Sequence, residues 1–179
     1  MQEIEYVDVV NENGGVISSI SKDEAHIKGL LHMTVISEVI NSKGEWLLVK
    51  QANDRQDAGQ YVSPIGGHVK SKESLKDALK REAWEEVGLK DFKFELVGKG
   101  IFNREVLGRK ENHYFIMYKI FSDEEPTLNN ESVSCERFTV EQIKKELKTN
   151  PQKFGAAFHF VWKRFFQTLI LNLYGSRAV

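Results

Sequence analysis

Three glutamates with helical spacing are the residues of this chain whose arrangement points most directly to chemistry. Glu82, Glu85 and Glu86 stand at i, i+3 and i+4 in the run REAWEE. In a helix these positions project from one face, within about one turn of each other. Carboxylates that close repel one another unless a cation joins them, and hard cations such as Mg²⁺ and Mn²⁺ prefer oxygen ligands. The run therefore predicts a divalent-cation site on a helix.

The helix that must carry these glutamates is expected over residues 72–87, with Gly88 as its C-terminal stop. On a wheel of about 100° per residue, the three acids fall on the same side as the apolar Leu75 and Leu79. A solvated charge run would lie opposite the apolar stripe, whereas these acids continue it. We therefore expect them to point toward the protein body, where carboxylates need partners. Trp84 is expected on the opposite side, facing away from the cation site.

Two more charged residues and a pair of glycines accompany this helix. Arg81 lies on the shoulder of the acidic face, and its planar guanidinium can bridge carboxylates. Glu73, two turns earlier, is placed to pair with Arg81 and hold it. Gly66 and Gly67 precede the helix, and residues without a Cβ let the backbone approach a metal ion or a phosphate closely.

Taken together, residues 67–89 (GHVKSKESLKDALKREAWEEVGL) resemble the Nudix box, GX5EX7REUXEEXGU, where U is a bulky apolar residue. The small Ala83 at the first U position is a mild departure. The positions that match the pattern are Gly67, Glu73, Arg81, Glu82, Glu85, Glu86, Gly88 and Leu89. The resemblance implies an α/β fold, the Nudix α/β/α sandwich with a mixed β-sheet, as a single domain over residues 1–179.

The resemblance also implies a reaction and its cation. Nudix enzymes hydrolyse nucleoside diphosphates linked to another moiety, X, by attack of water on phosphorus with the help of divalent cations. By resemblance, Mg²⁺ or Mn²⁺ binds to Glu82, Glu85, Glu86 and the backbone carbonyl of Gly67. A diphosphate is polyanionic, so metal ions must neutralise its developing charge and lower the pKa of the attacking water.

The same resemblance assigns Arg81 and Glu73 to orienting the catalytic glutamates. The general base is either one of the box glutamates or a glutamate on a later loop. Glu131 and Glu136 are the candidates there.

The segments around the box resemble a subset of Nudix proteins related to isopentenyl-diphosphate isomerase. The shared pieces are EYVDVVNENGGVI, GLLHMTV and EWLLVKQ. Those isomerases use a catalytic cysteine in a segment matching SPIGGH, where this chain carries Gly66. The missing cysteine argues against isomerisation and the complete box favours hydrolysis. Isoprenoid-diphosphate isomerisation and ligand binding without catalysis remain the two alternatives.

Histidines in the same region carry a weaker signal. His32 stands where the isomerase-like subset tends to carry a histidine, and His26 and His68 can approach the same region. One histidine at the start of an apolar strand is usually structural, and three alone do not establish a second metal site.

Cations and aromatic residues outside the box are candidates for contacting the substrate. Lys50, Arg55 and Arg104, with Arg109, carry the charge needed to bind phosphates. The candidate pocket aromatics are Tyr61, Phe102 and Tyr114, for which core packing is the alternative. Nothing in these residues selects a nucleobase, a sugar or an isoprenoid as X.

Composition bounds the remaining possibilities. With 179 residues, 41% hydrophobic and 28% charged, the chain suits one well-cored domain. A net charge of -1 gives no field that would recruit nucleic acid or an anionic membrane. The single cysteine, Cys135, excludes a disulfide framework and a cysteine-rich zinc site, and it suits a cytoplasmic protein. No stretch approaches the ~18 apolar residues that span a bilayer.

The flanking elements divide the chain into three parts. A hairpin and a short helix capped by Ser21 are expected over residues 1–30, the Nudix core over 31–149 and a C-terminal helix over 150–175. Within the core, strands are expected near 31–40, 45–51, 61–63, 68–69, 92–103, 112–121 and 137–140, with a helix over 141–148.

The C-terminal helix is expected to begin with Asn150 as N-cap and Pro151 at N1, and to end at Gly175. Its core stripe consists of Phe154, Phe158, Val161, Phe165 and Leu169, and Trp162, Phe166, Ile170 and Leu173 widen it. A stripe that wide predicts either deep packing or an additional contact between two subunits of a homodimer.

Overall fold

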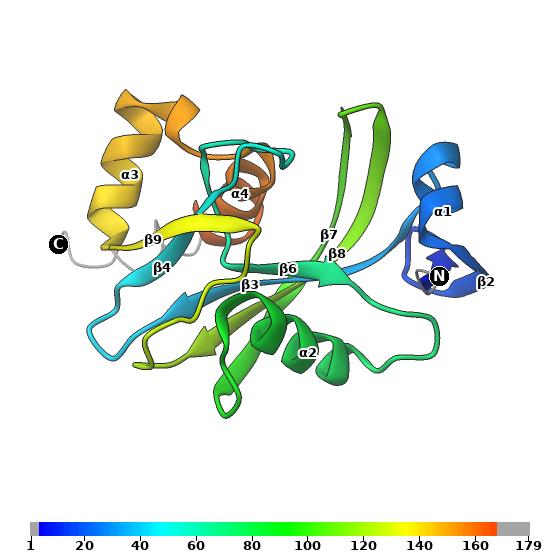
Figure 1. Cartoon of the computed structure of the whole chain (residues 1–179), viewed down its shortest axis with the longest axis horizontal. Helices are drawn as coiled ribbons and strands as arrows, with labels where there is room; N and C mark the ends of the chain where they lie inside the picture. The colour runs from blue at the N-terminus through cyan, green and yellow to red at the C-terminus, as the bar shows by residue number, and fades with distance from the viewer. Residues whose placement is uncertain (1–3, 168–179) are drawn as a thin grey trace, which may run out of the picture.

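The computed structural model describes residues 4–167, in which nine strands form one mixed sheet (Figure 1). None of the helices in this range is long and apolar enough to cross a membrane. The elements, in chain order, are β1 (Tyr6–Val10), β2 (Val16–Ser21), α1 (Lys22–Lys28), β3 (His32–Ile40), β4 (Trp46–Gln51), β5 (Tyr61–Val62), β6 (Ile65–His68), α2 (Leu75–Val87), β7 (Lys93–Val106), β8 (Arg109–Phe121), β9 (Ser132–Phe138), α3 (Val140–Thr149), the 3₁₀ turn η1 (Pro151–Lys153), α4 (Ala156–Val161) and the π-helical turn η2 (Trp162–Phe166).

Strand β3 is the centre of the sheet. One of its edges pairs in parallel with β8, which places His32 beside His113. Its other edge pairs antiparallel with β6, which places Thr34 beside His68, and its far end pairs with β4. Seven of its nine residues (HMTVISEVI) are buried, as expected of a strand covered on both faces. Segments far apart in the chain therefore meet along β3.

The two faces of the sheet are covered by different helices (Figure 1). Helix α2 buries Leu79 and Ala83 against Val35 and Ile116 on one face. The other face belongs to a second cluster, in which α4 and η2 pack over β3, β4, β7 and β8. The predicted α/β/α sandwich with a mixed sheet is confirmed.

Helix α2 starts three residues later than the sequence predicts. Ser74 is the N-cap, and its side chain accepts a hydrogen bond from the backbone N–H of Asp77 at 3.1 Å. Lys72, the predicted start, has a φ of 66°, which a right-handed helix excludes. The predicted end is correct, because Gly88 adopts the left-handed conformation with a φ of 73°.

The N-terminal elements follow the prediction, whereas the later strands are longer than predicted. Ser21 caps α1 by accepting from the N–H of Glu24, and Gly29 ends it at a φ of 64°. Strands β7 and β8 continue to the tight turn at Leu107 and Gly108, with φ of 49° and 71°. Strand β9 covers residues 132–138 rather than 137–140 because it pairs with β4 along its length. Pairing with a partner strand, which local sequence does not encode, extends all three.

The prediction of one helix from Asn150 is wrong. Asn150 makes no side-chain cap, the chain forms a single 3₁₀ turn, and α4 begins only after Gly155. The break arises because the Gly155 N–H donates to the carbonyl of Tyr61 at 2.9 Å, and Phe154 forms a bridge with the same residue. A Cβ at Gly155 would lie 2.7 Å from a methyl of Val62, so the close approach needs glycine. The predicted end at Gly175 lies outside the described residues.

The predicted core stripe of this segment is buried as far as the structure describes it. Phe154, Phe158, Val161 and Phe165 all belong to the second core cluster. The widening residues Trp162 and Phe166 pack against Trp46 in the chain's own core and thus offer no apolar face to a second subunit. The remaining members, Leu169, Ile170 and Leu173, lie outside the described residues.

A buried carboxylic acid interrupts the apolar run of β3. Glu38 has an exposed fraction of 0%, and the Ser63 hydroxyl donates to one of its oxygens at 2.6 Å. Its other oxygen is buried without a hydrogen-bond partner. Burial raises the pKa of Glu38 to about 8, so the group is neutral at pH 7.

Replacing Glu38 with glutamine should therefore remove a pH dependence of stability. The folded chain keeps this proton up to about pH 8, whereas the unfolded chain loses it near the ordinary value of 4.5. The free energy of unfolding of the unmodified protein should thus fall relative to Glu38→Gln as pH rises from 5 to 9, by on the order of 3 kcal/mol. Urea unfolding of both proteins at several pH values tests this, because other groups titrate alike in both. Parallel curves would show that Glu38 ionises normally.

Candidate active site

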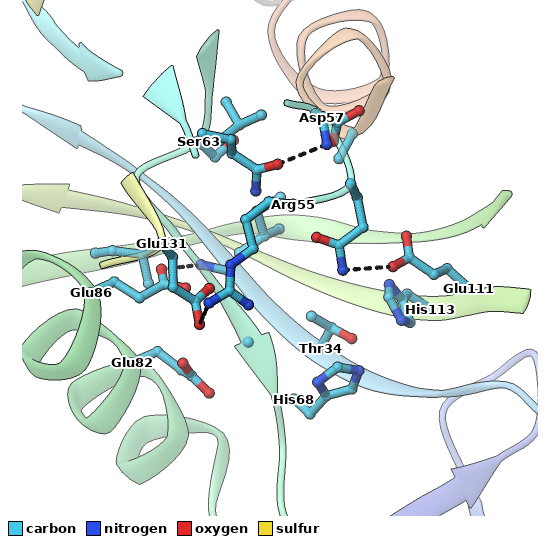
Figure 2. A pocket seen from close by; sticks show the side chains of 18 of the residues that line it. Thr34, Arg55, Asp57, Ser63, His68, Glu82, Glu86, Glu111, His113 and Glu131 are labelled. Atoms are coloured by element: carbon cyan, nitrogen blue, oxygen red, sulfur yellow. Dashed lines mark hydrogen bonds and ion pairs between the residues drawn. The ribbon is translucent and has the colours of Figure 1, made fainter. Parts of the chain in front are cut away.

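A cleft of about 400 Å³ opens where α2, β6 and β8 come together. Glu82, Glu85 and Glu86 line one wall, and His68 and His113 line another. Figure 2 shows Arg55 reaching across the space between these walls. The glutamates predicted to bind a cation are thus brought together in this cleft.

Each box glutamate is held by a different contact. Glu82 has an exposed fraction of 8% and lies directly over Gly67, where an added Cβ would come within 1.9 Å of its carboxyl carbon. Glu86 accepts a hydrogen bond from the Gly66 N–H at 2.8 Å. Glu85 is the most exposed of the three and accepts from Arg81 at 3.3 Å. The glycine pair therefore lets α2 press its acids against the backbone of β6.

Arg81 braces this arrangement. Its Nε and Nη2 each donate to a carboxylate oxygen of Glu73 at 2.8 Å, and its Nη1 donates to Glu82 at 2.5 Å. Nη2 also donates to the backbone carbonyl of His68 at 2.9 Å. Burial works against ionisation of Glu73, yet the hydrogen bonds from Arg81 and from the Lys70 N–H hold the pKa of Glu73 below its usual value. The guanidinium thus fastens α2 to β6.

The pKa values of Glu82 and Glu86 lie above the usual value of a glutamate. Burial, with the charge of Glu82 next, raises the pKa of Glu86 well above its usual value. Burial also raises the pKa of Glu82, although Arg81 opposes the rise. Because carboxylates this close titrate as a group, a cation bound between Glu82 and Glu86 would favour their ionised forms.

Three of the four cations predicted to bind phosphate line the cleft, and one does not. Arg55 lines the cleft and pairs with Glu131 at 3.3 Å. Arg104 also lines it, but its charge is taken up by Asp57 at 2.8 Å and by Glu111 at 2.5 Å. Arg109 lines the cleft as well. The prediction for Lys50 is not supported, because its neighbours on β4 face the cleft and Lys50 does not.

Some of the other predicted site residues line the cleft and others do not. Glu131 lines the cleft, whereas Glu136 lies outside it and accepts a hydrogen bond from the Tyr61 hydroxyl at 2.7 Å. Of the three predicted aromatics, Phe102 lines the cleft, together with the unpredicted Phe115, and neither Tyr61 nor Tyr114 does. Trp84 has an exposed fraction of 51% and points away from the cleft, as the wheel predicts.

Four histidines gather beside the acids, one more than the sequence suggests. His26, His32, His68 and His113 each offer a ligand nitrogen, and these atoms lie within 4.8 Å of one another. Burial is the main cause that lowers the pKa of all four, with His26 at about 4, so the imidazoles are neutral and able to bind a metal ion. His113 could have been found only from the register of β3 against β8.

Comparison with known protein sequences agrees with this geometry. A family model described as the NUDIX domain matches residues 30–158. An isopentenyl-diphosphate Delta-isomerase of Aliivibrio fischeri (strain MJ11) is 32% identical over 171 residues, which cover 89% of this chain and 94% of that protein. A Nudix hydrolase of Nostoc sp., itself named uncharacterized, is 31% identical over 137 residues, which cover 72% of this chain and 76% of that protein.

Solved structures give the same fold. A MutT protein from Methanosarcina mazei Go1 is 26% identical with a TM-score of 0.62, covering 78% of this chain and 95% of that one. DR0079 from Deinococcus radiodurans is 21% identical with a TM-score of 0.73, covering 91% of this chain and 100% of that one. The second likeness concerns the fold alone.

The two adjacent glycines offer a matched test of the acidic wall. Gly67→Ala should displace Glu82, because the added methyl collides with its carboxyl group. We expect Mn²⁺ affinity, measured by calorimetric titration, to fall roughly 10–100-fold, the range for a misoriented metal ligand. Gly66→Ala should bind Mn²⁺ normally, because its Cβ would have nothing within 4 Å and the N–H to Glu86 is kept. Equal Mn²⁺ affinity of the two variants would show that Glu82 is not a ligand of the metal ion.

Proposed function

The chain belongs to the family of NUDIX-domain proteins and is a Nudix-type hydrolase, and we propose that it cleaves a diphosphate bridge with the help of Mg²⁺ or Mn²⁺. The proposed substrate is a nucleoside diphosphate linked to another moiety, or a similar small diphosphate. The observation that carries the proposal is the meeting of Glu82, Glu85 and Glu86 on one wall of the cleft. The single cysteine supports our further proposal that it works in the cytoplasm.

The donor set fits the proposed cation. Glu82, Glu85 and Glu86 would hold it, with the backbone carbonyl of Gly67, and an all-oxygen set favours a hard divalent ion. Such an ion neutralises diphosphate charge and lowers the pKa of a water molecule. Burial and repulsion between carboxylates raise the pKa values of Glu82 and Glu86, and a bound cation would offset both effects.

The chain's own side chains would position the reactants. Arg81, held by Glu73, keeps Glu82 and Glu85 turned toward the cleft. Glu131 is the proposed base outside the box, since it lines the cleft. Arg55 pairs with Glu131 at 3.3 Å and holds this carboxylate beside the cleft, where it would accept a proton from water.

The cations that line the cleft are the proposed phosphate-binding residues. Arg55 and Arg109 are the proposed contacts, because both line it. Asp57 and Glu111 pair with Arg104 and offset its charge, so its attraction for a phosphate is weakened. We retain Arg104 as a substrate contact only through its remaining N–H groups.

Isomerisation of an isoprenoid diphosphate is the second candidate, favoured by the name of the Aliivibrio relative. Gly66 stands where the isomerases carry their cysteine, and Cys135 is exposed on β9 and does not line the cleft. No sulfur nucleophile is therefore available among the described lining residues. A binding domain without catalysis has no need of the complete acidic set.

Glu85→Gln should abolish most turnover while leaving the fold intact. Glu85 is exposed toward the cleft, so the change removes a cation ligand without opening a cavity. We expect kcat to fall about 100-fold or more, the scale of losing a group that activates water. The assay offers nucleoside diphosphate sugars and isopentenyl diphosphate with diamagnetic Mg²⁺, and follows products by ³¹P and ¹H NMR.

Two matched variants serve as controls. Glu95→Gln on β7 makes the same chemical change on an exposed strand away from the cleft, and Trp84→Ala alters the outer face of the same helix. Both should turn over substrate within about twofold of the unmodified rate, the noise of most such surface changes. Wild-type turnover by Glu85→Gln would refute the cation role. Conversion of isopentenyl diphosphate without phosphate release would favour the isomerase.

A further inference from the structure

We propose that Asp57 is a positioning residue, which holds the β4–β5 loop (residues 52–60) in place so that Arg55 faces the cleft. Asp57 lies outside the Nudix box and would act on the substrate only through Arg55. The proposal rests on the proposed function, because it concerns how the cleft binds a diphosphate.

The β4–β5 loop sends one side chain toward the acidic wall and another toward the opposite wall of the cleft. Arg55 pairs with Glu131 at 3.3 Å. Asp57, two residues further on, has an exposed fraction of 7% and pairs with Arg104 of β7. Figure 2 shows Arg55 extending toward Glu131 and Asp57 lying beside α4. The loop therefore has the proposed phosphate contact on one side and a buried anchor on the other.

The polar groups of Asp57 are all engaged. Its two carboxylate oxygens accept from Nη1 of Arg104 at 2.8 and 2.9 Å, and one of them also accepts from the Ala156 N–H at 3.3 Å. Its own N–H donates to the side chain of Gln51 at 2.8 Å, and its carbonyl accepts from the Gln60 N–H at 2.9 Å. One buried residue thus joins the loop to β7, to the start of α4 and to the end of β4.

The start of α4 leaves room for this carboxylate. The first N–H groups of a helix have no partner within it, so a carboxylate placed there is stabilised. A Cβ at Gly155 would lie 2.8 Å from the carboxyl carbon of Asp57. Glycine at this position therefore lets the first turn of α4 approach Asp57 closely.

Arg104 is itself fixed from a second side. Its Nε donates to Glu111 of β8 at 2.5 Å, and Glu111 also accepts from the side chain of Gln56 at 3.4 Å. Asp57 and Glu111 are both buried, so the guanidinium lies between two buried carboxylates. Because Gln56 belongs to the loop as well, two consecutive loop residues bind to this network.

The loop has no large apolar side chain that could pack it against the rest of the chain. Its sequence is ANDRQDAGQ, and Asp57 is its one buried residue. Polar contacts must therefore hold the loop in place. Gln60 holds the end of the loop by donating to the carbonyls of Gln152 and Phe154, which leaves Asp57 as the buried anchor beside Arg55.

A buried charge network contributes geometry more than stability. Removing charges from water is costly, and apolar residues of similar volume often stabilise a fold equally well. Here two carboxylates share one guanidinium, at the wall of a cleft that is proposed to bind an anion. What the network supplies is a fixed orientation of the loop relative to β7 and β8.

Asp57→Asn tests the proposal, since asparagine keeps the size of the side chain and loses the charge that holds Arg104. The probe is methylenediphosphonate with Mg²⁺, a diphosphate analogue whose P–C–P bridge water does not cleave. Its Kd, measured by calorimetric titration, should rise about 10-fold, the scale of losing one hydrogen bond from a charged group. For a cleaved substrate, KM should rise equally while kcat stays within about threefold, because the contact with Arg55 serves binding.

A double variant separates positioning through Arg55 from general loosening of the fold. Arg55→Gln alone should also raise the Kd about 10-fold. If Asp57 acts through Arg55, then Asp57→Asn combined with Arg55→Gln should again give about 10-fold, whereas independent effects would multiply to about 100-fold.

Hydrogen exchange reads the loop without any ligand. Amides of residues 52–60 should exchange faster in Asp57→Asn than in the unmodified protein and at the unmodified rate in Arg55→Gln. Asp54→Asn is the matched control, because it makes the same change on the same loop at a side chain that is 80% exposed and does not line the cleft. Its Kd and loop exchange should stay within about twofold of the unmodified values.

A second variant serves if Asp57→Asn does not fold. Ala156→Pro removes the N–H that Asp57 accepts and places a ring carbon there, while proline suits the first position of a helix. Gly155 before it already has the extended backbone that a following proline requires. Ala156→Pro should raise the Kd at least about threefold.

Two results would overturn the positioning role. One is a folded Asp57→Asn whose Kd for methylenediphosphonate stays within twofold of the unmodified value. The other is a loss in the double variant that equals the product of the two single losses. Failure of the proposed function looks different, because the unmodified protein itself would then bind no diphosphonate or cleave no diphosphate.

Discussion

The contact on which the rest of the site depends is the set of hydrogen bonds made by Arg81. Three carboxylates turned inward on one helix repel each other and oppose burial. Arg81 offsets part of that cost by donating to Glu82 and Glu85, while Glu73 fixes its guanidinium from the other side. This brace fixes Glu82 and Glu85 at the cleft, while the Gly66 N–H holds Glu86.

The same guanidinium connects the acidic wall to the histidine cluster. Arg81 donates to the carbonyl of His68, the last residue of β6, while Gly66 and Gly67 on the same strand contact Glu86 and Glu82. One strand of four residues, held by its register against β3, therefore positions both groups. Anything that shifts β6 should therefore affect both groups together.

Local patterns explain what the sequence predicted well. The spacing of Glu82, Glu85 and Glu86 relative to the apolar positions correctly placed them on the inner side of α2 and Trp84 on the outer side. Capping by Ser21 and Gly88 likewise depends on neighbours in the chain. These features need only helix geometry, so one sequence suffices to predict them.

Apart from the late start of α2, which Ser74 and the positive φ of Lys72 set locally, the main failures involve pairing between distant segments. The C-terminal helix starts late because Phe154 and Gly155 bond to Tyr61, far upstream. His113 joins the histidines through the parallel register of β8 with β3. The periodicity of the sequence encodes neither of these pairings.

The charge of the cleft follows from the same long-range contacts. The described residues that line it include seven acidic and six basic side chains, and ion pairs occupy most of the basic ones. Added positive charge would favour entry of a polyanionic diphosphate into so balanced a cleft, which supports the proposed divalent cation.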